Sequence, residues 1–392
     1  MKPIRYPLAT RSWGHEEVEA IQGVIQRDFY TMGASVARFE AEFAAYAGTA
    51  HAVMVNSGSS ANLLMAAALR FRKEAPLLPG DEILVPAVSW ATSYYPFTQY
   101  GLKLRFVDID PHTLNYDLER LAEAFTPRTR AVLAVNLLGN PHDFDALRAI
   151  LAGRDVVLLE DNCESLGATF KGRQAGTFGL MGTYSTFFSH HMSTMEGGLI
   201  VTEDRELYEI LLCLRAHGWT RQLPQENLVS GTKSPDPFEE LFRFVLPGYN
   251  VRPLEMEGAT GSEQLKKLPG FVSQRRANAA HFQARLGEHP HFRIQREVGE
   301  SSWFGFSLIL KEGAPFTRRQ VVALLGEEGI ECRPIVGGNF TKNPVMRWLD
   351  HSIHGDLRHA DHLDRHGLFV GNQETDLRES IDLLTLVLAR LS

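Results

Sequence analysis

The sequence predicts an α/β protein: a large domain on a parallel, doubly wound sheet, followed by a smaller α+β domain. Three observations carry this prediction. Short apolar runs recur through the first two-thirds of the chain, helical stretches lie between them, and the pattern changes near residue 250. Near-continuous apolar strands that alternate with helices are typical of a parallel sheet covered on both faces.

The elements of the large domain follow in order along the chain. Each apolar run ends in a turn or in polar residues, so each is predicted to be a buried strand. The clearest strands are EILVPA (82–87), LRFVDID (104–110), AVLAVNLLG (131–139) and DVVLLEDN (155–162). The clearest helices are SANLLMAAALRFRKEA (60–75) and DFDALRAILAG (143–153).

The small domain begins where a Gly/Pro-rich turn opens a long helical region, LPGYNVRPLEMEGATGSEQLKKL (246–268). An alternating strand, SSWFGFSLIL (301–310), follows it. We therefore expect a large domain over residues 1–250 and a small α+β domain over residues 251–392. The polar, turn-rich segment QLPQENLVSGTKSPDPFEE (222–240) is predicted to be a surface excursion at an active-site rim or a subunit contact.

Composition narrows the class of protein. Hydrophobic residues make up 44% of the 392 and charged residues 22%, as in ordinary soluble globular proteins. The balance of 40 basic against 47 acidic residues gives −7, without a basic cluster, which argues against nucleic-acid binding. No apolar run approaches the length of a membrane span, and MKPIRYPLATRSWG lacks the apolar stretch of a signal peptide. Three scattered cysteines (Cys163, Cys213 and Cys332) fit a reducing compartment, so a cytoplasmic enzyme is expected.

The first candidate for chemistry is a Gly/Ser turn that opens a helix, NSGSSANLLMAAAL (56–69). Ligands of α/β sheets bind beyond the carboxyl ends of the strands. Backbone N–H groups around Gly58 and Ser59, together with the helix N-terminus, make a favourable phosphate site. The alternative is an ordinary helix cap by Ser59 or Ser60.

Two further segments suit an aromatic cofactor. In LLEDNCES (158–165), Asp161 ends a buried strand and Glu164 follows one turn on. A carboxylate there can pair with a protonated ring nitrogen, as in pyridoxal phosphate (PLP) enzymes, although a helix-capping aspartate is the alternative. Trp90, in PAVSWATSYYP (86–96), can lie flat against a cofactor ring or belong to the core.

The most informative loop is GTYSTFFSHHMSTMEGGLIVT (182–202), which carries Ser185, His190 and His191 before Glu196 and two glycines. Adjacent histidines suggest a metal site or a solvated loop. Histidines at adjacent positions rarely present both imidazole rings to one metal ion. No third ligand lies at a spacing that is typical of a metal site. The sequence therefore predicts no metal site.

Taken together, these motifs resemble the DegT/DnrJ/EryC1/StrS family of fold-type I, PLP-dependent sugar aminotransferases, over nearly the whole chain. The family's loop reads roughly Ser-Phe-x-x-x-Lys, then eight residues ending in Gly-Gly. Counting back from Gly198 places that lysine at His190, and none of the nine lysines lies in this loop. A slip of one residue in the alignment would move the position to His191.

That departure is similar to a subgroup, the sugar 3-dehydratases of dideoxysugar biosynthesis, which carry histidine at this point. The matching segments are AVSWATSYYP, NLLGNP, LLEDNCESLGATF, FFSHHMSTMEGG, RAHGWTRQLP and FVLPGYNVRPLEMEGA. The resemblance implies a cytoplasmic PLP- and pyridoxamine phosphate (PMP)-dependent lyase that removes the C3 hydroxyl of a nucleotide-linked 4-keto-6-deoxyhexose. GDP-4-keto-6-deoxymannose, of the colitose pathway that supplies lipopolysaccharide O-antigen, is the expected substrate, with GDP or CDP left open by the residues.

The missing lysine decides the expected chemistry. A lysine would anchor the cofactor covalently and move protons at C4′, whereas an imidazole can do only the second. The resemblance implies that His190 is the base, that Asp161 keeps the ring nitrogen protonated and that Glu164 lies near the cofactor's 3′-oxygen. Glu196 is expected to orient the loop. PMP would be regenerated from glutamate, and ammonia would be released.

The resemblance also implies a homodimer with shared active sites. Asn250 would reach the phosphate of the partner's cofactor, alongside Ser59 and Ser185 of the home subunit. Arg221 and Arg252 are candidates for the carboxylate of glutamate, because a planar guanidinium binds carboxylates bidentately. Either arginine can equally belong to a surface or interdomain ion pair.

Three other functions are less consistent with the sequence. An ordinary sugar aminotransferase would need a lysine at position 190. A catalytically inactive PLP-fold binding protein is disfavoured, because a decayed site has no reason to keep Asp161, Trp90 and Ser59 and lose only its lysine. A metal- or NAD-dependent sugar-nucleotide enzyme lacks support, since no G-x-G-x-x-G follows an early strand.

Overall fold

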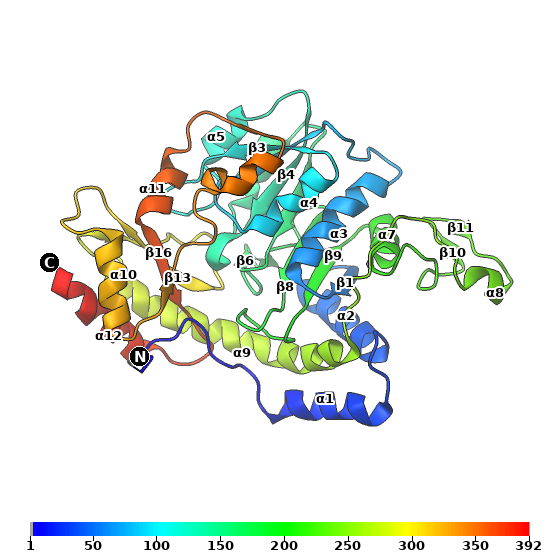
Figure 1. The fold of residues 1–392 in the computed structure, drawn as a ribbon, viewed down its shortest axis with the longest axis horizontal. Helices are drawn as coiled ribbons and strands as arrows, with labels where there is room; N and C mark the ends of the chain where they lie inside the picture. The colour runs from blue at the N-terminus through cyan, green and yellow to red at the C-terminus, as the bar shows by residue number, and fades with distance from the viewer. Residues whose placement is uncertain (1–2, 392) are drawn as a thin grey trace.

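The computed structural model describes residues 3–391 and contains a large eight-stranded sheet and a separate four-stranded sheet. Figure 1 shows the large sheet at the centre, with the C-terminal elements and both ends of the chain to its left. The α/β class and the change of pattern near residue 250 match the sequence analysis. The division at residue 250 stays a prediction, because two segments pack across it, as described below.

The large sheet is mixed rather than purely parallel. Its order is β1 (His51–Val55), β9 (Gly198–Thr202), β8 (Met181–Ser185), β5 (Val157–Asp161), β4 (Thr129–Val135), β2 (Glu82–Pro86), β3 (Lys103–Val107) and β15 (His351–Ile353). β9 is antiparallel to both neighbours, and all other pairs are parallel. The prediction of a parallel sheet is wrong for β9, because the loop from β8 carries no crossover helix and returns the chain as a wide hairpin.

Helices cover both faces of this sheet. Alternate residues of the strands point to opposite sides, so Val53 of β1 packs with one layer and Met54 with the other. One layer contains α3 (Gly58–Phe71), η1 (Ala91–Ser93), α4 (Tyr95–Gln99), α7 (Arg205–Arg215) and α11 (Arg358–His366). The other contains α2 (Ala34–Ala47), α5 (Leu118–Glu123), α6 (Phe144–Leu151) and the first half of α9 (Glu255–Leu286).

The small sheet is antiparallel, in the order β12 (Phe292–Arg293), β13 (Gly305–Leu310), β16 (Gly367–Gly371) and β14 (Cys332–Arg333). It packs against α10 (Arg318–Glu327), α12 (Arg378–Leu388) and the second half of α9. The long helix α9 therefore contributes to both cores, as its course along the molecule in Figure 1 shows. Tyr6, from the other end of the chain, is fully buried in this second core.

The remaining elements are short or peripheral. α1 (His15–Arg27) packs on α9, and the predicted excursion at 222–240 is an arm made of β10 (Glu226–Asn227), β11 (Gly231–Thr232) and α8 (Pro237–Glu240). Figure 1 shows this arm projecting at the right. The others are η2 (Leu137–Gly139), β6 (Thr169–Phe170), β7 (Arg173–Gln174), η3 (Phe340–Lys342), η4 (Pro344–Trp348) and η5 (Ala389–Leu391). Within residues 3–391, no helix is both long and apolar enough to cross a membrane.

Candidate active site

A cleft of about 440 Å³ lies beyond the carboxyl ends of the parallel strands, where the small sheet closes over them. Strand register brings its parts together, since Gly198 pairs with both Val55 of β1 and Ser185 of β8. The Gly/Ser turn after β1 and the histidine loop between β8 and β9 therefore start at one edge. Of the residues predicted for the site, seven line this cleft: Gly58, Ser59, Trp90, Asp161, Glu164, Ser185 and His190.

The Gly/Ser turn keeps its first helical turn open towards the cleft. Ser57 is the helix cap, and its Oγ accepts a hydrogen bond from Ser60 N at 3.1 Å. Ser59 is therefore not the cap; its hydroxyl is exposed and lies 2.8 Å from that of Thr92. A Cβ on Gly58 would meet Ser185 Cβ at 2.7 Å, so only glycine allows this approach. The arrangement suits a phosphate at the N-terminus of α3.

Asp161 is buried at the end of β5 and is held by three donors. Its Oδ2 accepts hydrogen bonds from Asn62 Nδ2 at 2.8 Å and Ser93 Oγ at 2.7 Å, and its Oδ1 accepts one from Cys163 N at 3.1 Å. No helix follows β5 directly, so Asp161 is not a helix cap. Three donors fix the carboxylate with its edge on the cleft, as a partner for a protonated ring nitrogen must be.

Glu164 lines the same cleft in a different environment. Burial raises the pKa of its carboxyl to about 7, and the negative charge of Asp161 adds to this. A single backbone donor, Leu138 N at 3.0 Å, acts in the opposite direction. Leu138 has φ +54°, a left-handed conformation that is costly for leucine, so the turn that supplies this donor is strained.

The two histidines of the loop have different surroundings. The ring of His190 lines the cleft and packs on Phe304 at 5.1 Å between ring centroids. His191 is buried behind it, and its Nε2 donates to Ser302 O at 3.1 Å. Burial, with the positive charge of Arg275, lowers the pKa of His190 to about 4, so the imidazole is neutral near pH 7. A neutral imidazole facing the cleft is ready to accept a proton.

The loop itself is cross-braced. Thr186 N donates to Gly197 O at 2.9 Å, Thr194 N donates to Thr186 O at 2.9 Å, and the two threonine hydroxyls lie 2.5 Å apart. Gly197 has φ +155°, and a Cβ there would meet both hydroxyls at 2.4 Å. The bracing fixes which residues of the loop turn to the cleft. His190 and Glu196 do, whereas His191 does not.

Three predicted residues do not line the cleft of their own chain: Arg221, Asn250 and Arg252. They lie together instead. Arg252 Nε donates to Asn250 Oδ1 at 2.9 Å, and the guanidinium groups of Arg221 and Arg252 lie 4.0 and 5.6 Å from the Trp219 ring. Trp90, by contrast, is 60% exposed on the cleft wall, so it is not a core residue.

Sequence reasoning missed Arg333, which reaches the cleft from β14 of the small sheet. The signal in ECRPIV (331–336) is weak, because β14 is only two residues long and does not stand out as a strand. It also missed Asn62 and Ser93, which hold Asp161. Within residues 3–391, no group of histidine, cysteine and acidic residues has the arrangement of a metal site, and no lysine lines the cleft.

A pyridoxal cofactor fits these residues. The open helix N-terminus suits its phosphate, Asp161 suits its ring nitrogen, and Trp90 offers an aromatic face. The cradle at Gly58 has no room for a side chain, as expected where a ligand approaches the backbone closely.

The fold and this site define a member of a known class. The chain belongs to the DegT/DnrJ/EryC1/StrS aminotransferase family, whose profile matches residues 11–374. It is 58% identical to the GDP-4-keto-6-deoxy-D-mannose 3-dehydratase of Yersinia pseudotuberculosis over 388 residues, which cover 99% of each chain.

Two solved structures are similar over nearly the whole chain. One is a GDP-4-keto-6-deoxymannose-3-dehydratase with a trapped PLP-glutamate geminal diamine. The other is a histidine-to-asparagine mutant of a 3-dehydratase with the same name, with bound GDP-perosamine. Each is 58% identical in sequence, with a TM-score of 0.97 over 98% of this chain and 100% of the other.

Proposed function

We propose that this chain is a PLP- and PMP-dependent 3-dehydratase that acts on GDP-4-keto-6-deoxymannose. One observation carries the proposal: a cleft with the residues for a pyridoxal cofactor presents the neutral imidazole of His190 where the family has its lysine. The 58% identity to 3-dehydratases supports both the reaction and the substrate. The structure with a PLP-glutamate adduct supports glutamate as the amino donor.

Different residues around the cleft bind different parts of the cofactor. The N-terminus of α3 with Ser59 and Ser185 binds the phosphate, Asp161 keeps the ring nitrogen protonated, and Trp90 covers one face. When bound, the cofactor would supply an electron-accepting ring and an amine that can condense with the keto group of the sugar. Because no covalent bond to the chain is available, these contacts carry all of the affinity.

His190 moves the protons. Its neutral ring takes the proton at C4′ and becomes an imidazolium, which can then protonate the hydroxyl that leaves C3 of the sugar. Overall, the C3–O bond breaks and the sugar gains two electrons, which come from glutamate as it is converted to 2-oxoglutarate with release of ammonia. The wall formed by Phe187 and Phe304 limits access of water to this ring.

The arginines serve anionic parts of substrate or donor. Arg333 faces the cleft from its own chain, whereas Arg221 and Arg252 lie outside it with Asn250. We infer that a second copy delivers these three, so the enzyme is a homodimer with shared sites. A cytoplasmic location remains an expectation, and the three cysteines, which are all free, agree with it.

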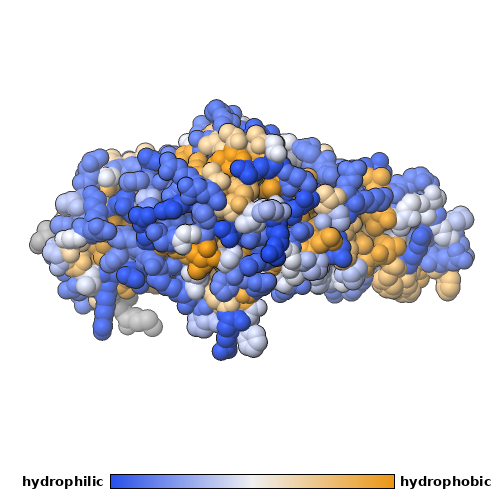
Figure 2. Space-filling view, turned by 90° about the horizontal axis from the view of Figure 1, so that it is seen from above, coloured by the Kyte–Doolittle hydropathy of each residue, from blue (hydrophilic) through white to orange (hydrophobic). Residues whose placement is uncertain are grey.

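The arm includes residues 241–245, which lead back from α8, and its exposed aromatic side chains support this homodimer. Phe238, Phe242 and Phe244 are 83, 64 and 58% exposed. Figure 2 shows apolar surface at the right-hand end of the molecule, where the arm lies. Arg221 stacks on Phe242 at 4.9 Å, so the arm and the arginine cluster form one continuous surface. A surface of this kind is typical of a subunit contact.

The test compares wild type with variants of His190 and measures whether the cofactor is bound covalently. The wild-type protein loaded with PLP should release all of it after borohydride treatment and denaturation, whereas His190→Lys should retain it covalently, as mass spectrometry would show. His190→Asn should bind PMP with wild-type affinity but lose dehydration by about 10³-fold, within the range that general bases contribute.

His191→Asn is the matched control, because its ring faces away from the cleft. It should keep more than a tenth of the activity. Covalently held cofactor in the wild-type protein would contradict the proposal, since one of the nine lysines would then reach the site. Dehydration that survives in His190→Asn and fails in His191→Asn would transfer the role of base to His191.

A further inference from the structure

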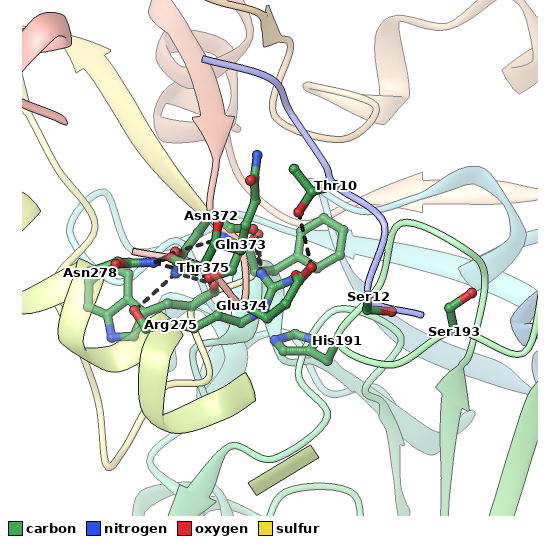
Figure 3. A network of polar contacts seen from close by, with 12 residues as sticks. Thr10, Ser12, His191, Ser193, Arg275, Asn278, Asn372, Gln373, Glu374 and Thr375 are labelled. Carbon is green, nitrogen blue, oxygen red and sulfur yellow. Dashed lines mark hydrogen bonds and ion pairs between the residues drawn. The ribbon is translucent and has the colours of Figure 1, made fainter. Parts of the chain in front are cut away.

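A buried arginine lies behind the histidine loop. Arg275, on α9, is only 3% exposed. Its Nη1 donates to Asn372 O at 2.6 Å and to Phe304 O at 3.3 Å. Figure 3 shows it among side chains from the C-terminal loop after β16, with the ring of His191 close by. The nearest acid, Glu374, lies 4.0 Å away and is itself bonded to Thr10 at 3.0 Å.

One short segment, residues 302–304, lies between Arg275 and His190 and contacts both. His191 Nε2 donates to Ser302 O, and Arg275 donates to Phe304 O. The Phe304 ring then packs on both histidines, at 5.1 Å from His190 and 5.8 Å from His191. Arg275 thus fixes the wall against which the ring of His190 rests.

The charge of Arg275 is enclosed, and its ion pair with Glu374 is long, at 4.0 Å. Besides burial, the charge of Arg275 lowers the pKa of His190, and together with the charge of His190 it lowers the pKa of His191. Other charged or titratable groups face the cleft from other elements: Glu196 on the same loop, Asp161 and Glu164 after β5, and Arg333 on β14. Arg275 differs from these groups in lying behind the cleft rather than lining it, and because it is only 3% exposed its field is little diluted by solvent.

We propose that Arg275 is a positioning residue for the dehydration, which holds Phe304 against His190 and, through its buried positive charge, keeps the imidazole in its proton-accepting form. This rests on the proposed function, in which His190 is the base. A base that must take a proton from carbon and then release it works only from its neutral state. A permanent cation behind it secures that state over a wide pH range.

The direct test is an NMR titration of the His190 ring in the full-length protein, with and without PMP, assigned by comparison with His190→Asn. In wild type the ring should stay neutral down to about pH 5. In Arg275→Met its titration midpoint should rise by about one pH unit or more towards the ordinary 6.5. Arg275→Lys, which keeps the charge, should remain close to wild type.

Arg276→Met is the matched control. Arg276 is the next residue of α9 and donates to Ser301 O at 2.9 Å, but its side chain is one-third exposed and pairs with Glu300. Removing it should cost similar hydrogen bonds and leave the His190 midpoint unchanged. The acid limb of the turnover-against-pH profile should move with the midpoint in Arg275→Met and stay in place in Arg276→Met.

A second variant keeps the test decisive if Arg275→Met does not fold. Glu374→Gln leaves the carbonyl bonds of Arg275 intact and removes the acid that faces it, so the His190 midpoint should fall. An unchanged midpoint in folded Arg275→Met, or in Glu374→Gln where Arg275→Met does not fold, would overturn the proposal and leave Arg275 a purely structural residue. Because the titration needs no turnover, this failure is distinguishable from failure of the proposed dehydration, which the His190 variants decide.

Discussion

Two carboxyl groups three residues apart, Asp161 and Glu164, are set up for different roles. Asp161 accepts hydrogen bonds from three donors, whereas Glu164 accepts one and is otherwise enclosed. With its pKa near 7, Glu164 carries a proton for much of the time at neutral pH. It can then donate a hydrogen bond to an oxygen such as the cofactor's 3′-oxygen, which an ionised carboxylate cannot do.

This difference predicts a pH effect on stability. The unfolded chain protonates Glu164 only below the ordinary value of 4.5, whereas the folded protein holds the proton up to about pH 7. The folded state binds the extra proton between these values, so this residue's contribution to the free energy of unfolding falls as the pH rises from about 4.5 to 7. The free energy of unfolding of Glu164→Gln should not show this fall. Relative to that of wild type, it should therefore increase by about 2–3 kcal/mol between pH 5 and pH 8.

Urea unfolding of the cofactor-free protein at several pH values measures this gain. Glu379→Gln, at an exposed glutamate of α12, is the control and should follow wild type throughout. A constant difference between wild type and Glu164→Gln across the range would show that Glu164 titrates normally.

Among the residues of the candidate site, the sequence predicted those at or just after strand ends and missed those that act through tertiary contacts. Asp161 and Ser185 end their strands and Trp90 lies just beyond its own, so topology alone brings them to one edge. Asn62 is an interior residue of a helix and looks like any other polar helix position. Its bond to Asp161 exists only because α3 packs across β5 and β8, which no local pattern reports.

Among the elements, α9 determines how the two halves of the molecule are held. Its first turn caps another helix, because Glu255 accepts hydrogen bonds from Gly33, Ser35 and Val36 at the N-terminus of α2. The next turns are unusually close to α2. A Cβ on Gly258 would lie 2.6 Å from the Val36 backbone.

Gly258→Ala is therefore expected to destabilise the protein by about 1–3 kcal/mol, because backbone must move to admit the methyl group. Gly270→Ala, later in the same helix, meets nothing within 4 Å and should stabilise it by up to about 1 kcal/mol. Thermal and urea unfolding of the two variants compare them. Equal effects would mean that α2 and α9 adjust freely to each other.

The sequence predicted strands better than sheet order. All four apolar runs chosen from the sequence for the large domain form parallel strands of the large sheet. A continuous apolar run is typical of a strand that is buried on both faces, so these strands stand out in the sequence. β9 runs against the parallel direction predicted for the sheet, and β15 was not predicted at all. Three residues, HSI (351–353), pair with β3 at the sheet edge, and so short a segment carries no periodicity.

The molecule as a whole has one feature that a single chain does not explain, the projecting arm with its exposed aromatic side chains. We expect the double variant Phe242→Glu/Phe244→Glu to sediment as a monomer of about 44 kDa and to bind PMP at least tenfold more weakly, because Asn250 would no longer reach the partner's cofactor. Leu386→Glu, at a 70% exposed position of α12, is the control and should remain a dimer. A wild-type monomer would refute the shared site.

The edge strand β15 and the buried Tyr6 also govern the order in which the protein can be completed during synthesis. β3 leaves the ribosome about 245 residues before its partner at 351–353, a delay of roughly ten to fifty seconds at ordinary translation rates. Throughout that interval its outer edge is an unpaired template for other strands. Tyr6 waits still longer for the small sheet that encloses it, and its neighbour Ile330 is made near the end. The nascent chain therefore keeps both the Tyr6 side chain and the outer edge of β3 without their partners for most of synthesis, and this interval is the one in which it is most vulnerable to aggregation.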